Sequence, residues 1–483
     1  MGGKDRLPET DAATIVAERV ARARAAQAVF DGATQEEVDE VVTAVGWAIV
    51  DPEHNLALAE LAVQDTGLGN VPDKVAKNRR KTMGLLRDLA RARSVGIIDE
   101  DPERGLVEIA RPVGVVGAVT PSTNPAATPA NNIINALKGR NAIILAPSPK
   151  GVSTLSLLLS YVHAELDRVG VPRDLVQQLP APVTRELTNE LMRQVDLVVA
   201  TGSQTNVRAA YASGSPAIGV GAGNVAVIVD ETADLGDAAD KIARSKTFDN
   251  ATSCSSENSV IAVASIAESL LAALGAHGGV LLDRQEAGAL ERAMFVDGHP
   301  APSFVAQSAP AIALRAGLSR QRLLDAAFLI VEETGVGPAH PFSGEKLSPV
   351  LTFYRAPDFA AATALAERVL RYQGSGHSIG LHSAQPQRAI GLGLALPVCR
   401  VIVNQAHCFA TGGSFDNALP FSLSMGCGTW GRNSISDNLN YRHFLNITRV
   451  VRPLEPSRVH EPTEEELFGS YLRKHPRGAG RKP

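Results

Sequence analysis

The first hundred residues carry apolar side chains three and four positions apart, with alanine and charged residues between them. This spacing predicts amphipathic helices over 12–30, 36–49 and 73–92. Near Ile97 the pattern changes, and residues 106–110 alternate as a half-buried strand does. We therefore expect a helical N-terminal region that ends in a short β segment.

From Val113 onward, short apolar runs without polar alternation are separated by helical patterns. The predicted strands are 113–120, 142–145, 176–179, 197–200 and 225–229, and the predicted helices are 131–138, 153–169, 184–193 and 206–213. Strands that are apolar at every position are typical of a parallel sheet with helices on both faces. This region is expected to be one α/β domain.

A second block of the same kind follows Asn250. Its predicted strands are 260–263, 328–331 and 400–403, and a helix is predicted over 266–274. The fold class is therefore α/β with two parallel-sheet domains, and we expect the boundary between them near Lys246–Asn250.

Composition and charge narrow the class of protein. The chain has 483 residues, 45% of them hydrophobic and 20% charged, with a net charge of −4. This balance indicates a globular protein and argues against a nucleic-acid or membrane partner. The first residues lack an apolar signal-peptide core, so we expect a cytoplasmic protein. The four cysteines have no metal-binding spacing, so no metal site is expected.

Two segments are candidates for chemistry. Gly219-Val-Gly221-Ala-Gly223 looks like a phosphate loop, but it precedes a strand, so a glycine-rich turn is favoured. Cys254 lies in a polar segment of small residues between a helix and a strand, where a cysteine can be exposed and reactive. Cys408 and Cys427 also lie near polar loops, so the residues alone leave the choice of nucleophile open.

Four segments resemble the aldehyde dehydrogenase superfamily, and in particular its CoA-acylating branch. They are 119–125, 246–258, 374–377 and 425–434, within a resemblance that runs from Ala12 to Val451. It implies an aldehyde dehydrogenase-like fold with a Rossmann-like cofactor domain (1–96 and 113–248), a catalytic domain (249–425), and a small β oligomerisation arm with the C-terminal tail (97–112 and 426–483). A homodimer or homotetramer is implied as well.

The resemblance also implies catalytic roles. Cys254 would attack an aldehyde as a thiolate, lose hydride from the thiohemiacetal to a nicotinamide, and keep the acyl group as a thioester. Asn124 and the backbone N–H of Cys254 would stabilise the oxyanion, although Asn124 could equally be a turn residue before Pro125. His377 would deprotonate the thiol of coenzyme A or help the enzyme thiolate to leave; packing near the coenzyme A entry is the alternative.

One absence points to the product. Hydrolytic relatives carry a glutamate base that activates water, and the corresponding segment here, Val220–Asn224, offers no carboxylate. Without that base a thiol can take the acyl group, so coenzyme A is the expected co-substrate and a thioester the expected product.

The cofactor is expected to be NAD or NADP. The residues that the resemblance assigns to it are Thr120, Pro121, Ser122, Thr201, Gly202, Ser203, Gly221, Gly223 and Glu345. Hydrolytic relatives have a lysine before Pro147, where this chain has Ala146, and many acylating relatives have a histidine where Ser148 stands. These departures leave the choice between the two nucleotides open.

The substrate is inferred from the tail. Residues 461–471 resemble the subgroup that acts on sulfoacetaldehyde, and Arg400 and Arg432 are candidate partners for its sulfonate. The alternatives are an acylating dehydrogenase of acetaldehyde or another short aldehyde, and, less favoured, a hydrolytic aldehyde dehydrogenase, a non-redox cysteine acyltransferase or a catalytically silent member of the fold.

Overall fold

The computed structural model describes residues 11–221 and 223–476. These residues divide into two units. The larger contains the described residues up to Ser94 together with Pro112–Leu445, and the smaller contains Val95–Arg111 and the described residues from Asn446 onward. Each is described by itself.

Four helices open the larger unit: α1 (Ala12–Phe30), α2 (Gln35–Val50), α3 (Pro52–Thr66) and α4 (Val71–Leu89). The apolar spacing predicts α1, α2 and α4, but not α3. Local signals define α3, because the Asp51 carboxylate accepts the N–H groups of Glu53 and His54, and Gly67 ends the helix in the left-handed conformation.

The first sheet is parallel and has five strands in the order β5-β4-β3-β6-β7. The strands are β3 (Val115–Thr120), β4 (Ala142–Pro147), β5 (Val176–Gln178), β6 (Leu197–Thr201) and β7 (Ala217–Val220). They alternate with α5 (Ala127–Lys138), α6 (Val152–Arg168), α7 (Arg185–Gln194) and α8 (Gln204–Tyr211). Since β3 pairs with both β4 and β6, the strand order reverses beside β3, the position at which parallel sheets bind ligands.

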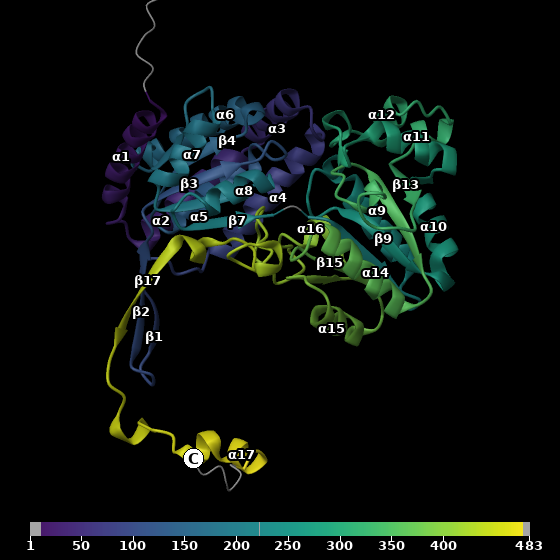
Figure 1. Ribbon diagram of the computed structural model, residues 1–483. Coiled ribbons are helices and arrows are strands. Elements are labelled where there is room, and N and C mark those ends of the chain that lie inside the picture. Colours follow the sequence, from purple (N-terminus) through teal and green to yellow (C-terminus); the bar gives the residue numbers. More distant parts are fainter. Residues whose placement is uncertain (1–10, 222, 477–483) are drawn as a thin grey trace, which may run out of the picture. The chain divides into compact units, whose positions relative to one another are not determined.

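The second sheet is also parallel and has seven strands in the order β10-β13-β14-β9-β8-β15-β16. Figure 1 labels β9, β13 and β15 of this sheet. The strands are β8 (Val225–Val229), β9 (Glu257–Val263), β10 (Gly279–Leu281), β13 (Phe328–Glu332), β14 (Val350–Ala356), β15 (Ile379–His382) and β16 (Val401–Val403). The helices between them include α9 (Leu235–Thr247), α10 (Ala267–Ala276), α14 (Phe359–Tyr372), α15 (Pro386–Ala395) and α16 (His407–Ala410).

The two faces of this sheet have separate cores. Along β8, Val225 and Val227 pack with α9 and α10, whereas Ala226 and Ile228 pack with α14. This division explains why the strands are apolar at every position. A third cluster is built around α11 (Arg284–Met294) and α12 (Ala309–Arg315).

The predicted boundary between the two blocks needs a correction. The sequence assigns 225–229 to the first block and places the boundary near Lys246–Asn250. In the structure β8 pairs with β9 and β15, so the second sheet begins at Val225. Gly219 and Val220 also lie in strand β7 and not in a turn. A strand that is buried on both faces has the same pattern in either sheet, so periodicity could not assign β8.

The smaller unit contains a three-stranded sheet in the order β1-β2-β17, followed by helix α17 (Glu464–Lys474) (Figure 1). The strands are β1 (Gly96–Asp101), β2 (Leu106–Pro112) and β17 (Leu445–Val451). Residues 426–445, predicted to belong to this arm, lie in the larger unit. Arg400 holds that segment there by donating to the carbonyls of Gly426 and Ser436. No helix among the described residues is long and apolar enough to span a membrane.

Candidate active site

Cys254 follows an unusual turn that joins α9 to β9. Asp249, Asn250 and Ala251 have φ angles of 50°, 50° and 58°, in the left-handed region that residues other than glycine rarely adopt. Each such residue costs about 1 kcal/mol or more. The buried Asp249 carboxylate offsets this cost by accepting hydrogen bonds from Lys74 (3.1 Å), Lys77 (2.5 Å) and the Thr252 hydroxyl (2.7 Å). The position of Cys254 is therefore fixed largely by α4.

Lys77 also orients the Asn124 side chain. The Lys77 ammonium donates to Asn124 Oδ1 at 2.9 Å and to Thr252 Oγ1 at 2.9 Å. An ammonium group has no acceptor, so it fixes the Asn124 oxygen on the Lys77 side and turns the amide NH₂ away from it. That NH₂ lies 3.5 Å from Thr123 Oγ1. Lys77 is thus a positioning residue for an amide donor at the cavity surface.

His377 is the polar partner of the cysteine. His377 Nε2 lies 3.5 Å from Cys254 Sγ, and His377 Nδ1 lies 2.7 Å from the Ser378 hydroxyl. The imidazole is only 1% exposed. An Nδ1–H that donates to Ser378 leaves Nε2 free to accept a proton from sulfur. The predicted pair of Cys254 and His377 is therefore brought together from segments 123 residues apart.

Burial keeps both members of this pair uncharged. It raises the pKa of the Cys254 thiol to about 12 and lowers the pKa of His377 to about 3, where nearby Arg400 acts in the same direction. The free protein therefore holds a thiol and a neutral imidazole, and ionisation of the sulfur has to be coupled to the attack on a substrate.

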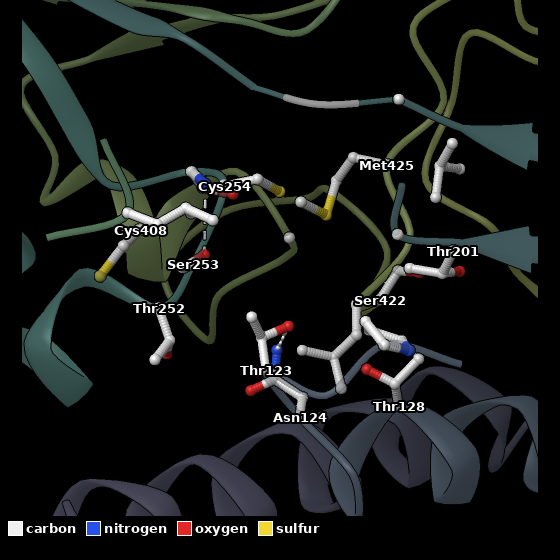
Figure 2. A pocket seen from close by; sticks show the side chains of 18 of the residues that line it. Thr123, Asn124, Thr128, Thr201, Thr252, Ser253, Cys254, Cys408, Ser422 and Met425 are labelled. Carbon is white, nitrogen blue, oxygen red and sulfur yellow. Dashed lines mark hydrogen bonds between the residues drawn. The ribbon is translucent and has the colours of Figure 1, made fainter. Parts of the chain in front are cut away.

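Cys254 and Asn124 line a cavity of about 340 Å³, and Figure 2 shows them on opposite walls of it. The lining comes from α4, the segment after β3, the start of α5, the ends of β6 and β7, the cysteine loop and residues 408–425. It includes Lys81, Thr128, Thr201, Glu345, Cys408, Ser422 and Met425. Thr201 and Gly221, assigned by resemblance to the cofactor, lie in this lining, as do Pro121, Ser122, Gly202 and Ser203.

Glu345 is the one carboxylate among the residues that line this cavity. Burial raises its pKa to about 8, although the backbone N–H of Gly223 donates to the carboxyl and acts in the opposite direction. It is therefore mostly protonated at neutral pH. Gly223 packs so closely on the Cys254 carbonyl that a Cβ atom would stand 2.1 Å from that oxygen. Gly223 thus holds the cysteine loop and Glu345, and lies outside the cavity lining.

A cleft of about 640 Å³ runs along the carboxyl ends of β3, β4 and β6. Thr120, Pro121, Ser122, Thr201, Gly202 and Ser203 line it, as the resemblance implies, together with residues of α7 and α8. Ser203 caps α8 by accepting the Asn206 N–H. Ser148 Oγ lines the cleft and is buried without a hydrogen-bond partner, so it is available to a ligand. The cleft fits a dinucleotide, whose phosphates would meet the N-terminus of α8.

The two arginines suggested for a sulfonate lie elsewhere. Arg400 is buried, and it donates to Asn438 and to the carbonyls of His377, Gly426 and Ser436. These bonds use four of its five N–H donors and hold the 426–438 segment in place. Arg432 lines a separate cavity with Trp430 and Tyr211. Neither arginine lines the cavity of Cys254.

Sequence reasoning missed the lysines of α4. Lys74, Lys77 and Lys81 are 4%, 5% and 8% exposed and stand at helical spacing on one face. The sequence did contain a signal for them: the three lysines occupy helix positions at which a buried stripe of side chains is expected. Their partners could not be read from the chain, because Asp249 lies 172 residues from Lys77. The described residues hold no cluster of three or more His, Cys, Asp or Glu side chains suited to a metal.

The fold and the site are together those of an aldehyde dehydrogenase: two parallel sheets, a dinucleotide cleft, and a loop cysteine facing an amide donor. The sequence profile of the aldehyde dehydrogenase family matches residues 6–279, and the chain belongs to this family.

Named relatives are similar over nearly the whole chain. Sulfoacetaldehyde dehydrogenase (acylating) from Cupriavidus necator is 62% identical, over 96% of this chain and 94% of that protein. The enzyme of the same name from Bilophila wadsworthia is 41% identical, over 95% of this chain and 99% of that protein. The crystal structure of an acetylating aldehyde dehydrogenase from Geobacillus thermoglucosidasius matches with a TM-score of 0.89 at 35% identity, covering 95% of this chain and 100% of that one.

Proposed function

We propose that this protein oxidises sulfoacetaldehyde with NAD⁺ or NADP⁺ and transfers the acyl group to coenzyme A. One observation carries the proposal: Cys254, with His377 Nε2 at 3.5 Å from its sulfur, lines a cavity whose one lining carboxylate, Glu345, is mostly protonated at neutral pH. Such a site can form an acyl-enzyme but has no ionised carboxylate to activate water for its hydrolysis. The similarity to enzymes named for sulfoacetaldehyde supports the choice of substrate.

The first half-reaction uses Cys254, His377 and Asn124. As Cys254 Sγ bonds to the aldehyde carbon, its proton passes to His377 Nε2, 3.5 Å away. The negative charge moves to the aldehyde oxygen, where the Asn124 NH₂ and the Cys254 backbone N–H donate to it; one such donor is worth about 3–4 kcal/mol in a transition state. A nicotinamide held by the residues that line the cleft would supply the hydride acceptor. Loss of hydride from the thiohemiacetal carbon leaves Cys254 as a thioester, and His377 releases its proton to solvent before the second half-reaction begins.

The second half-reaction needs a base for the incoming thiol. Once the acyl group occupies Cys254 Sγ, His377 Nε2 is the basic nitrogen beside the thioester. It takes the proton of the coenzyme A thiol as that sulfur attacks the acyl carbon, and it returns the proton to Cys254 as the carbon–sulfur bond breaks. In the overall reaction, an aldehyde, an oxidised nucleotide and a thiol are converted to a thioester, a reduced nucleotide and a proton.

The charge of the cleft supports use of NADP⁺ as well as NAD⁺. Sites selective for NAD⁺ commonly place a carboxylate on the ribose 2′-hydroxyl, and an arginine accommodates the 2′-phosphate of NADP⁺. Arg185 is the one charged residue that lines this cleft, and no carboxylate lines it. We propose that both nucleotides bind, and that Arg185 favours NADP⁺.

The proposed function is tested by following the absorbance of the reduced nucleotide at 340 nm. Sulfoacetaldehyde, acetaldehyde and propionaldehyde are compared with NAD⁺ and NADP⁺, with and without coenzyme A, for the wild-type protein and Cys254→Ala. We expect turnover that requires coenzyme A, is fastest with sulfoacetaldehyde and is lost in the variant. Acylation of coenzyme A without nucleotide reduction would instead indicate a non-redox acyltransferase. Faster turnover of acetaldehyde than of sulfoacetaldehyde would indicate that the substrate is a short aldehyde.

We also propose that the smaller unit joins copies of this chain into a dimer or tetramer. β1 and β17 are the edges of its sheet, and edge strands readily pair with a second chain. Apolar side chains on α17 are exposed, with Leu467, Phe468 and Tyr471 at 59%, 51% and 62%. A second copy of the chain would cover this surface.

A further inference from the structure

Lys81 is a buried amine with no anionic partner among the residues that the structure describes. Of the three buried lysines of α4, Lys74 and Lys77 both form ion pairs with Asp249. Lys81 forms no ion pair with any residue that the structure describes. Its ammonium donates to the Gly412 carbonyl at 2.7 Å and lies 5.5 Å from the centre of the Phe421 ring. This one hydrogen bond leaves two of the three N–H donors of the ammonium for another group.

Lys81 lines the cavity that contains Cys254, and no ionised acid of that cavity balances it. Glu345 is mostly protonated at neutral pH, because burial raises its pKa to about 8. The two lining thiols are neutral as well, since burial raises the pKa of both Cys254 and Cys408 to about 12. An anion that pairs with Lys81 would therefore have to arrive with a ligand.

Thr128 supplies a second, independent sign of a ligand. It stands in the first turn of α5 and lines the same cavity, as Figure 2 shows. Its side chain is 1% exposed, and its hydroxyl has no hydrogen-bond partner in the structure. A buried hydroxyl without a partner is costly unless a ligand or water satisfies it.

We infer that Lys81 and Thr128 bind the anionic end of the aldehyde, with the carbonyl end directed to Cys254 and Asn124. A sulfonate has three acceptor oxygens and one negative charge, which suit the free donors of an ammonium and a hydroxyl. This inference rests on the proposed function and assigns its substrate specificity to a residue of α4. Arg400 and Arg432 have no part in it.

The charge on Lys81 gives the inference a pH signature. Burial, with Arg80 acting in the same direction, lowers its pKa to about 7. The other titratable groups that face it are Lys77 on the same helix, which lowers the pKa, and Cys408 and Cys254, which are uncharged thiols near pH 7. The charged form is therefore lost as the pH rises through 7. Selectivity for an anionic over an uncharged aldehyde should fall above that pH.

The test compares sulfoacetaldehyde with propionaldehyde, an uncharged aldehyde of similar length. In Lys81→Met we expect kcat/KM for sulfoacetaldehyde to fall about 100-fold, the cost of removing one partner of a buried charge pair, while propionaldehyde changes by less than about threefold. Lys81→Arg should keep most of the selectivity. Arg79→Gln removes an exposed charge from the same helix and should leave kcat/KM unchanged for both substrates. Equal losses for both substrates in Lys81→Met, or no loss, would overturn the inference.

A binding measurement separates this inference from the proposed function. Ethanesulfonate should slow the alkylation of Cys254 by iodoacetamide in the wild-type protein, less at pH 8 than at pH 6, and should not do so in Lys81→Met. Protection does not depend on turnover. If the wild-type protein fails to oxidise sulfoacetaldehyde yet ethanesulfonate protects, the substrate assignment fails and the anion site stands. If turnover occurs and ethanesulfonate gives no protection, the anion site is wrong.

Discussion

At the scale of residues, the site works with groups that burial holds neutral. Cys254 and His377 are in contact, yet burial moves their pKa values apart, to about 12 and about 3. A resting ion pair of thiolate and imidazolium is thereby disfavoured. The cysteine is protected from adventitious chemistry until a substrate is present, and the proton moves only when the new bond to sulfur forms.

This state predicts how alkylation of the free protein depends on pH. The thiolate is the reactive form, and a thiol whose pKa is raised to about 12 gains thiolate about tenfold per pH unit below that value. The rate of iodoacetamide labelling at Cys254, followed by mass spectrometry of its peptide, should therefore rise steadily from pH 7 to pH 10. Cys254→Ala supplies the background from the other cysteines. A plateau near pH 7 would mean that the thiolate is already formed.

His377 has its own prediction. In His377→Ala, transfer to coenzyme A should slow about 100-fold or more, the usual contribution of a positioned base. Hydride transfer should suffer less, because the first turnover can draw on solvent to ionise Cys254. Stopped-flow absorbance separates the two, as a retained burst of reduced nucleotide followed by a slow steady state. A steady state as fast as that of the wild-type protein would remove His377 from the second half-reaction, and an equal loss in both phases would contradict its greater role there.

Family segments in the sequence pointed to the residues proposed to react, but not to the groups that hold them. Cys254, Asn124 and His377 stand in recognisable motifs. Lys77 and Asp249 do not, because their effect depends on a contact between α4 and the cysteine loop that no local pattern encodes. Lys81 was missed for the same reason.

At the scale of elements, α4 links the N-terminal helices to the chemistry. Its buried face carries Lys77, which orients Asn124, and Lys81, which faces the cavity. Gly84 allows α4 to approach the Phe421 ring, because a Cβ atom at Gly84 would stand 2.2 Å from it. The periodicity of the chain predicted α4 and most strands, since those follow from local patterning. The sheet to which β8 belongs depends on pairing with distant strands, and was predicted wrongly.

Gly84→Ala tests this close approach. Phe421 is fully buried, so the added methyl must displace α4 or the ring, and overpacking of this kind costs about 1–3 kcal/mol. We expect the melting temperature to fall by a few degrees and kcat/KM to fall about tenfold or more, because α4 carries Lys77. Gly275→Ala in α10 is the matched control, since nothing lies within 4 Å of its new methyl. An unchanged Gly84→Ala protein would show that α4 is not constrained here.

At the scale of the whole molecule, the described chain separates into a catalytic unit and a small β unit with an exposed apolar helix. A sheet of three strands with two open edges is a poor domain by itself, and pairing with a second copy would satisfy those edges. The sequence predicted β2 of this unit but not β1 or β17, and it extended the unit too far, because residues 426–445 have little regular structure and are held by long-range bonds to Arg400.

The oligomer prediction is tested with a double substitution, Leu467→Ser with Phe468→Ser. Removing two exposed apolar side chains from α17 should lower the molar mass in solution, from that of a tetramer to a dimer or from that of a dimer to a monomer. The mass is measured by light scattering after size-exclusion chromatography. Leu394→Ser, at a residue that is 85% exposed in α15, is the control and should leave the mass unchanged. A wild-type protein that is monomeric at micromolar concentration would contradict the proposal.

The most direct test of the account is a single measurement on the wild-type protein without coenzyme A. Sulfoacetaldehyde and saturating nucleotide are mixed with the protein, and reduced nucleotide is counted at 340 nm. We expect a burst of about one equivalent per Cys254 that then stops, because the acyl group stays on sulfur with no ionised carboxylate to activate water, and rapid turnover once coenzyme A is added. Sustained production of acid without coenzyme A would contradict it.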